Sequence, residues 1–331
     1  MKKNKSKKIR HTLLKIFGIV VALVGLFFAF TFVSNLILNK TDLKKIEPYG
    51  QLVPVDGKQM NVTIKGEGAE TIVLIPGQGT ASPTLDFELL IDELVTDYKV
   101  VVVEPFGYGW SDTTNTERTT SNIVKEIHTA LEHVNVDEFI LMGHSIAGIY
   151  ALEYTNQYPE QVTAFIGVDT SVPHQSGMDA KLPLRTFAFA KQSGLLRFMS
   201  NFSSSPYTAF GYKEHTVEQL TLFSNKNSMN KTTLNELKLL SENFKAAQSL
   251  TFPEQLPLLL FIQQFGAGVP NWLELHEEQA KQSQYGKVIP LDGSHYLHHT
   301  KSKEIADATR QYLEQVKQQK QNNNQSQNLA Q

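Results

Sequence analysis

The chain has 331 residues, of which 41% are hydrophobic and 19% are charged, and it contains 10 histidines but no cysteine. A chain of this size can bury the core of one large domain, whereas the lack of cysteine excludes disulfides, thiolate metal sites and cysteine nucleophiles. Residues 1–15 carry seven basic side chains and no acidic one, which leaves 24 basic against 33 acidic side chains elsewhere, a net charge of −9. This acidic main part argues against a nucleic acid as the partner.

A long hydrophobic segment follows the basic leader at residues 1–15. Residues 16–38 contain no charged side chain, and a helix of that length spans about 35 Å, enough for a bilayer core of about 30 Å. A cleaved signal peptide is the alternative, but its apolar region is usually shorter and is followed by small residues, and no such site follows here. Because seven basic residues precede the segment and only Lys40, Lys44 and Lys45 closely follow it, we expect a single-pass anchor in the cell membrane, with a cytoplasmic N-terminus and with the large domain that follows on the extracytoplasmic side.

Strands and helices are predicted to alternate after a polar linker at residues 39–49. The Asp-Gly turn at residues 56–57 and the alternating run after it predict a hairpin over residues 50–66. Further strands are predicted at 71–75, 100–103, 139–142, 164–168, 258–263 and 288–291, and helices at 84–96, 119–134, 148–157 and around 305–312. This order is typical of an α/β fold with a doubly wound, mostly parallel sheet.

Two regions depart from the alternating pattern of the predicted 50–316 domain. About 80 residues after the strand at 164–168 show helical, loop-punctuated sequence with few strand signals. We therefore predict a helical lid, at about residues 172–250, inserted into the sheet domain. The Gln/Asn-rich tail at residues 317–331 is predicted to be disordered.

The most informative motif is Gly-His-Ser-Ile-Ala-Gly at residues 143–148, which joins an apolar strand to a helix. A sharp strand-to-helix turn can present one serine hydroxyl above the edge of a parallel sheet. Small residues at Gly143, Ala147 and Gly148 permit this turn, because larger side chains would collide with the neighbouring strand and helix. Ala147 replaces the second glycine of G-x-S-x-G and adds only a methyl group. The motif makes Ser145 the candidate nucleophile, which needs a partner base.

Together with other segments, this motif resembles the α/β-hydrolase superfamily over roughly residues 50–316. The resemblance rests on Pro-Gly-Gln-Gly at 76–79, on Glu-Pro-Phe-Gly-Tyr-Gly-Trp-Ser-Asp at 104–112 and on Gly-Ser-His at 293–295. Pro76 stands where the family often has His, and Glu104 where it often has Asp. Neither position is needed for nucleophilic attack, so these two departures do not change the resemblance to the hydrolases of this family.

The resemblance implies a general base at His295, which follows the last predicted strand and so lies at the same sheet edge as Ser145. His298 and His299 are close to it in sequence and could line the pocket, but we expect the start of a helix to rotate them away. The resemblance therefore makes His295 the candidate base.

The resemblance also implies a carboxylate that orients the imidazole and stabilises its charged form. The usual position, after the penultimate strand, holds Val269. The other arrangement known in the family places the acid at the end of the strand after the elbow, where this chain has Asp169. Asp169 is the first candidate, and Glu274 and Glu277 are the alternatives.

The negative charge that develops on a substrate oxygen needs fixed donors. We expect the backbone N–H groups of Gln78, in a glycine-flanked turn, and of Ile146, directly after the nucleophile, to supply them. No metal site is predicted, since His298 and His299 have no acid at a suitable spacing. No cofactor is predicted either, because the segment at residues 77–79 lacks the third glycine of a dinucleotide fingerprint.

These observations predict a membrane-anchored serine hydrolase that cleaves a small-molecule ester, or an amide, through an acyl-enzyme intermediate. One alternative is an aminopeptidase of the proline-releasing type, which would need a cluster of acids in the lid, where Glu214 and Glu218 are scattered. The other alternative is a catalytically silent binding module with a hydrolase fold. The predicted partners are the substrate and, through residues 16–38, the lipid bilayer.

Overall fold

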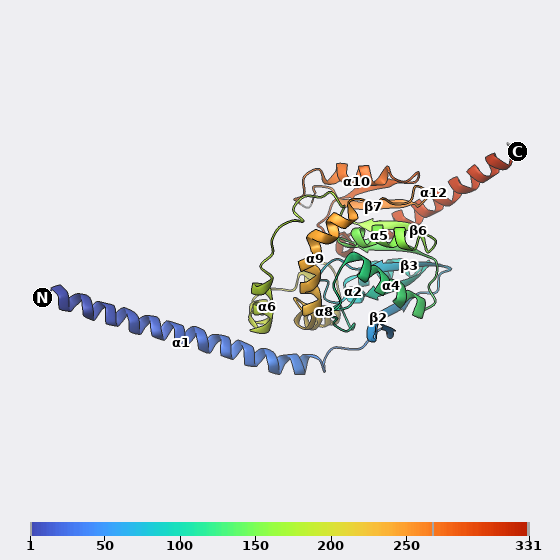
Figure 1. Ribbon diagram of the computed structural model, residues 1–331. Helices are drawn as coiled ribbons and strands as arrows, with labels where there is room; N and C mark the ends of the chain where they lie inside the picture. The colour runs from blue at the N-terminus through green and yellow to red at the C-terminus, as the bar shows by residue number, and fades with distance from the viewer. Residues whose placement is uncertain (1, 267, 330–331) are drawn as a thin grey trace.

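The computed structural model describes residues 2–266 and 268–329 and has an eight-stranded sheet at its centre (Figure 1). The strands are β1 (Gln51–Val55), β2 (Lys58–Lys65), β3 (Glu70–Ile75), β4 (Tyr98–Glu104), β5 (Phe139–His144), β6 (Val162–Val168), β7 (Leu258–Gln263) and β8 (Lys287–Leu291). Their order across the sheet is β1-β2-β4-β3-β5-β6-β7-β8, with β1, β2 and β4 joined antiparallel and all other neighbours parallel. The mostly parallel sheet agrees with the prediction.

The parallel strands are buried on both faces, which explains their continuous apolar sequences. Along β3, Val73 and Ile75 join the core on one side of the sheet, while Ile72 and Leu74 join the core on the other. The first core is completed by α4 (Thr120–His133) and α5 (Ala147–Gln157). The second is completed by α3 (Glu88–Leu94) and α12 (Ser302–Leu329), so helices cover both faces.

Five helical segments lie between β6 and β7. They are α6 (Leu184–Gln192), α7 (Leu195–Ser200), the 3₁₀ helix η1 (Pro206–Ala209), α8 (Glu214–Asn227) and α9 (Lys231–Ala247). Asn230 caps α9, since its side chain accepts hydrogen bonds from the N–H groups of Thr232 and Thr233. α6 and α7 have no buried residue, whereas α8 and α9 have several. These helices form the inserted lid.

The N-terminal helix α1 runs from Lys2 to Asp42 without a break and extends far from the sheet domain (Figure 1). It therefore includes the basic leader and the first residues of the predicted linker. From Lys7 to Asp42 it is long and apolar enough to cross a membrane.

The C-terminal tail differs from its prediction. α12 continues as a helix to Leu329, although disorder was predicted for residues 317–331, of which 330–331 lie outside the described part. The buried residues Ile305, Tyr312 and Val316 fix the first turns of this helix against the sheet. Once a helix is nucleated, adding residues costs little, and glutamine is a good helix former.

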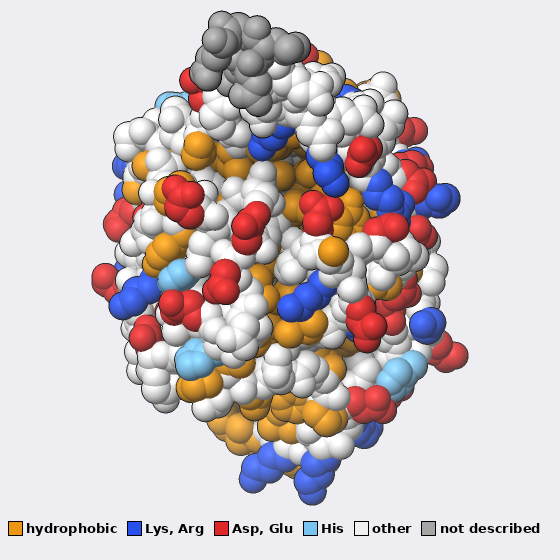
Figure 2. Space-filling view, turned by 90° about the vertical axis from the view of Figure 1, so that its right-hand side faces the viewer, with side chains coloured by type: hydrophobic (Ala, Val, Ile, Leu, Met, Phe, Trp, Pro, Cys, Tyr) orange, Lys and Arg blue, Asp and Glu red, His pale blue; other side chains and the backbone are white. Residues whose placement is uncertain are grey.

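The remaining helices are short. α2 (Pro83–Asp86) and α3 follow β3, α10 (Trp272–Ala280) joins β7 to β8, and α11 (Leu297–Thr300) follows β8. On the face from which α12 projects, acidic and basic side chains are interspersed and hydrophobic side chains line the hollows (Figure 2). This face thus presents no continuous basic surface.

Candidate active site

Ser145 lies between β5 and α5 in a strained backbone conformation, with a φ of 56°. This left-handed region is unfavourable for a residue with a side chain, and it is stabilised here by close packing. A Cβ atom on Gly143 would lie 2.6 Å from the Cβ of Ala147, and one on Gly148 would lie 2.3 Å from the carbonyl oxygen of Ser171. The small residues therefore allow the turn that exposes Ser145.

Three predicted residues from distant parts of the chain form one hydrogen-bonded series. The Nε2 atom of His295 lies 3.0 Å from the Oγ of Ser145, and its Nδ1 lies 2.6 Å from the Oδ2 of Asp169. His295 is 35% exposed, whereas Asp169 is fully buried. Because a carboxylate can only accept, Nδ1–H donates to Asp169, which leaves Nε2 free to accept the proton of Ser145.

Asp169 follows β6 and is held by three donors besides His295. Its Oδ1 accepts from the backbone N–H of Gln263 and from Nε1–H of Trp272, both at 2.9 Å, and its Oδ2 accepts from the side-chain amide of Gln263 at 2.8 Å. Burial raises the pKa of Asp169, but the hydrogen bonds from His295 and Gln263 outweigh burial and the net pKa is lowered. The carboxylate is therefore ionised near neutral pH.

The alternative acids lie elsewhere. Glu274 and Glu277 are exposed on α10, whose buried face carries Trp272 and His276. Trp272 is the residue of this helix that reaches Asp169. Sequence reasoning missed Trp272 and Gln263 as partners of Asp169; the signal was a tryptophan and a glutamine flanking a loop after a buried strand.

The two predicted oxyanion donors lie close to Ser145. A Cβ on Gly77 would lie 3.2 Å from the Cβ of Ser145, so the turn that holds Gln78 packs directly against the elbow. Within the described residues, neither the N–H of Gln78 nor that of Ile146 donates to another protein group. Both N–H groups are therefore available to a substrate oxygen.

The turn at Gln78 is also tied to the lid. The N–H of Gly79 donates to the hydroxyl oxygen of Tyr108 at 3.1 Å, and that hydroxyl donates to Glu236 on α9 at 2.9 Å. The hydroxyl of Tyr150, on α5, donates to the same carboxylate at 2.7 Å. Burial raises the pKa of Glu236 despite these hydrogen bonds. One buried acid of the lid thus connects the turn after β3 with the helix that follows Ser145.

A cavity of about 220 Å³ adjoins the turn at Gln78. Its walls combine residues of that turn with residues of α2, of η1 and the position after it, of α8 and of the segment after β8, namely Gln78, Gly79, Thr80, Ala81, Asp86, Pro206, Tyr207, Phe210, Ser224, Tyr296 and His299. The lid therefore forms one wall of the space next to the candidate site.

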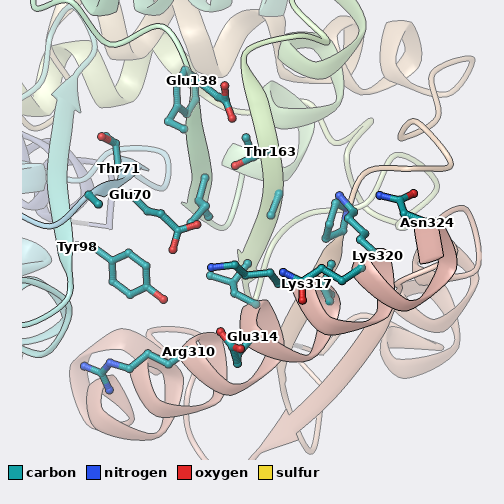
Figure 3. Close-up of a pocket in the computed structure, with 18 residues that line it drawn as sticks. Glu70, Thr71, Tyr98, Glu138, Thr163, Arg310, Glu314, Lys317, Lys320 and Asn324 are labelled. Atoms are coloured by element: carbon teal, nitrogen blue, oxygen red, sulfur yellow. The ribbon is translucent and has the colours of Figure 1, made fainter. Parts of the chain in front are cut away.

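A larger groove, of about 680 Å³, lies at the other edge of the sheet, where the strands begin. Arg310, Glu314, Lys317 and Lys320 of α12 face it from one side, and Glu70 is among the residues opposite (Figure 3). Sites in parallel sheets form at the carboxyl ends of the strands, so we assign the candidate site to the edge that carries Ser145 and not to this groove.

A second buried cluster lies beneath the site. The Nε2 atoms of His298 and His299 lie 2.8 and 3.0 Å from the two carboxylate oxygens of Asp86, and the hydroxyl of Tyr207 donates to the same carboxylate at 2.8 Å. Burial opposes ionisation of Asp86, but the interaction with His298 outweighs it and lowers the pKa. Burial also lowers the pKa of His298, although the nearby Asp86 carboxylate opposes this shift.

This cluster corrects the expectation that His298 and His299 have no partner acid. Asp86 is distant in sequence, but one of its carboxylate oxygens and the ligand nitrogens of the two histidines lie within 4.8 Å of one another. Among the described residues, Asp86, His298 and His299 are the group whose ligand atoms lie close enough to hold a cation. In this structure the hydrogen bonds to Asp86 already use both Nε2 atoms. The one sequence signal for Asp86 was an acidic residue among apolar neighbours in the predicted helix 84–96.

His144 connects the cluster with the candidate base. Its ring contacts that of His298, with 4.6 Å between centroids, and its Nε2–H donates to the carbonyl oxygen of His295 at 3.0 Å. Burial, with His298 and His295 nearby, lowers the pKa of His144. The neutral ring thus holds the backbone of His295 in place.

Comparison with known proteins agrees with this architecture. Residues 70–308 match the family model for the alpha/beta hydrolase fold. The uncharacterized protein YbdG of Bacillus subtilis is 29% identical over 264 residues, which cover 75% of this chain and 80% of YbdG. Wild-type Cfl2 from Burkholderia cenocepacia has a TM-score of 0.62 at 19% identity, covering 79% of this chain and 94% of Cfl2. An esterase from Thermogutta terrifontis has a TM-score of 0.59 at 17% identity, covering 81% and 99%.

The family model covers most of the chain from β3 into α12, which includes the elbow at Ser145, the lid and the segment that carries His295. The structural likenesses are at low identity and concern the fold alone. On the family match, the chain belongs to the α/β-hydrolase fold family.

Proposed function

We propose that this protein hydrolyses a carboxylic ester through an acyl-enzyme intermediate, with Ser145 as nucleophile, His295 as general base and acid, and Asp169 as the group that orients His295. The observation that carries the proposal is the continuous series from Ser145 Oγ to His295 Nε2 and from His295 Nδ1 to Asp169. It has the geometry that serine hydrolases need for proton transfer, with hydrogen-bonded atoms within about 3.2 Å.

In the proposed reaction His295 Nε2 takes the proton of Ser145 as Oγ bonds to the carbonyl carbon of the ester. The tetrahedral intermediate then breaks the bond to the leaving oxygen, to which His295 returns the proton. A water molecule attacks the acyl-enzyme in the same way and gives its proton to His295. The second tetrahedral intermediate then breaks its bond to Oγ, to which His295 returns the proton, so that the carboxylic acid leaves and Ser145 is restored; Asp169 stays ionised throughout and stabilises the imidazolium.

The ester proposal is preferred to the two alternatives on particular residues. Serine at the elbow fits acyl transfer. Glu214 and Glu218 are exposed on α8, and His215 between them pairs with Glu47, so these acids form no cluster that could hold the free amine of a peptide. The intact series at Ser145 argues against a silent binding module.

A fluorophosphonate probe tests the proposal. We expect it to label the full-length protein and to fail on Ser145→Ala, because the probe needs an activated serine. Hydrolysis of p-nitrophenyl esters of graded length is expected to exceed that of aminoacyl-nitroanilides. Absence of labelling in the wild type would support the silent module, and faster cleavage of the anilides would support the aminopeptidase.

The proposed oxyanion donors are tested with two substitutions at one position. Gln78→Pro removes the backbone N–H and is expected to lower kcat by about 10²–10³-fold, the effect of losing one oxyanion donor. Gln78→Ala keeps that N–H and is the matched control, expected to retain most of the activity. Both variants are compared by thermal unfolding, so that a folding defect is recognised. Equal loss of kcat in two well-folded variants would assign the role to the side chain instead.

We also propose that α1 anchors the protein in the cell membrane, with the catalytic domain on the extracytoplasmic side. The support is its length and apolar composition together with the basic residues at its start. Basic residues flanking a span favour the cytoplasmic side.

A further inference from the structure

The exposed lid helices α6 and α7 pack against the apolar helix α1. The rings of Phe27 and Phe198 lie 5.1 Å apart between centroids, and those of Phe28 and Phe189 lie 5.3 Å apart. In Figure 1, α6 lies beside α1 and apart from the sheet. Part of the lid therefore rests on the proposed anchor.

The contact is close and specific. A Cβ on Gly194, which joins α6 to α7, would lie 2.4 Å from the carbonyl oxygen of Thr31. Arg197 pairs with Asp42 and donates to the side-chain oxygens of Asn35 at 3.0 Å and Asn39 at 2.6 Å. The polar contacts thus lie at the C-terminal end of α1, and the aromatic contacts lie nearer its middle.

The aromatic contacts involve the part of α1 that a bilayer would surround. Twenty residues of helix span a core of about 30 Å, which residues 16–35 already supply. Phe27 and Phe28 precede Asn35 by eight and seven residues, or about 10–12 Å along the axis. If α1 crosses the membrane, Phe189 and Phe198 therefore lie within the leaflet on the side of the catalytic domain.

Large apolar side chains of α6, α7 and the segment to Phe202 are exposed, as a position within a bilayer leaflet requires. Phe189, Met199 and Phe202 are 53%, 57% and 77% exposed, and Phe202 packs on Phe198 with 5.1 Å between ring centroids. Large exposed hydrophobic side chains of this kind mark an interaction surface. Aromatic contact is continuous from Phe27 of the anchor to Phe202 of the lid.

The part of the lid at residues 180–213 is positively charged, whereas the chain after residue 15 is negatively charged as a whole. Residues 180–213 contain five basic side chains and no acidic one, although the chain after residue 15 has a net charge of −9. Lys181, Arg185 and Lys213 are exposed. A segment that combines exposed apolar side chains with exposed basic ones is typical of segments that lie in the interface of an anionic membrane.

The same segment forms a wall of the cavity beside the candidate site. Pro206, Tyr207 and Phe210 line that cavity together with Gln78, and Pro206 follows Phe202 by only four residues. The surface that would face lipid is therefore close along the chain to the space that would hold the acyl or alcohol part of a substrate.

We propose that α6, α7 and the segment to Phe202 lie in the bilayer leaflet next to the catalytic domain, and that the substrate is an acyl ester dissolved in that leaflet. This inference rests on the proposed function, since it names the substrate class of the same site. The occupant of the apolar surface is lipid. A second protein copy on this surface is the outcome that would contradict it.

The absence of cysteine allows a direct test. Phe189→Cys and Phe202→Cys are each labelled with an environment-sensitive NBD fluorophore in the full-length protein, reconstituted in vesicles that contain phosphatidylglycerol. Ser249→Cys is the control, an exposed position after α9, at the end that lies away from α1 (Figure 1). We expect blue-shifted emission, quenched by lipids with spin-labelled acyl chains, at residues 189 and 202 but not at 249.

Two spectroscopic outcomes would overturn the inference. One is water-like emission at residues 189 and 202 while the protein stays with the vesicles. The other is a blue shift that depends on protein concentration and resists the lipid quencher, which would assign the surface to a second copy. A protein that does not stay with the vesicles contradicts the anchor and the inference together.

A kinetic test separates the inference from the proposed function. Phe189→Ser/Phe202→Ser is expected to lower the hydrolysis of a long-chain ester in vesicles about tenfold, while hydrolysis of soluble p-nitrophenyl acetate stays within twofold of the wild type. Equal rates on the vesicle ester would overturn the inference and leave the hydrolase proposal intact. A wild type inactive on both esters and unlabelled by fluorophosphonate would overturn the hydrolase proposal and the named substrate class, whereas the fluorophore result would still decide where the lid lies.

Discussion

Asp169→Asn is expected to lower the kcat for a p-nitrophenyl ester by about 10⁴-fold with little change in fold. The amide can still accept from Gln263 and Trp272, but its NH₂ group cannot accept the proton of His295 Nδ1. The imidazole would then prefer the tautomer with its proton on Nε2, which cannot act as a base toward Ser145. The corresponding substitution in a serine protease has an effect of this size.

Glu274→Gln is the matched control for that substitution. Glu274 is exposed on α10, so the exchange removes a carboxylate that does not contact His295. We expect kcat within twofold of the wild type. If Glu274→Gln were severely impaired and Asp169→Asn were not, the acid of the proposed triad would have to be reassigned.

Among the substitutions proposed here, Asp86→Asn is expected to lower the free energy of unfolding most. Asp86 is buried and accepts hydrogen bonds from the buried His298 and His299 and from the partly buried Tyr207. Removing one partner of a buried ionic or hydrogen-bonded group costs about 3–5 kcal/mol, because the others stay buried without it. For a domain of this size each kcal/mol lowers Tm by about 2–4 °C, so a decrease of roughly 6–20 °C is expected. Thermal unfolding of the detergent-solubilised protein measures it.

The difference between Asp86→Asn and the wild type should depend on pH. The pKa of Asp86 is lower in the folded protein than in the unfolded chain, where an aspartate titrates at about 3.9. Its contribution to stability is therefore complete above that value and is lost as the pH falls toward the folded pKa. We expect the two unfolding temperatures to differ most near pH 7 and to converge below about pH 4.

Asp97→Asn provides the control for Asp86. Asp97 also pairs with a basic residue, Arg310, but this ion pair is exposed at the surface. Exposed pairs contribute little to stability, so Tm should be nearly unchanged. A wild-type Tm for Asp86→Asn, or a difference that grows toward acid pH, would contradict the role assigned to the cluster.

Features formed by residues that are close together in the sequence could be predicted without the structure. The strand, the small residues and the serine of the elbow occupy only residues 139–148, and their local pattern predicts the turn that the structure contains. The strands alternate with helices at a spacing that allows a mostly parallel sheet, so the fold was predictable as well. For the carboxylate that orients His295, the sequence left three candidates, Asp169, Glu274 and Glu277. The roles of Ser145, His295 and Asp169 stay predictions that the substitutions above will test.

Other features depend on contacts between residues far apart along the chain. Asp86 lies more than 200 residues from His298, and Glu236 lies 128 residues from Tyr108. No local pattern pairs such groups, because each acid resembles an ordinary surface residue until folding buries it beside a donor. Burial then makes the pairing necessary, since an unpaired buried acid is costly.

The sequence by itself determined the uncharged hydrophobic segment at residues 16–38, the alternating strands and the elbow, since each of these depends on local composition and periodicity. Only the tertiary structure decided that Asp86 joins His298 and His299, that α7 packs on α1, and that the tail continues α12. The physical reason is that these features are stabilised by burial against distant segments, and burial is a property of the folded chain as a whole.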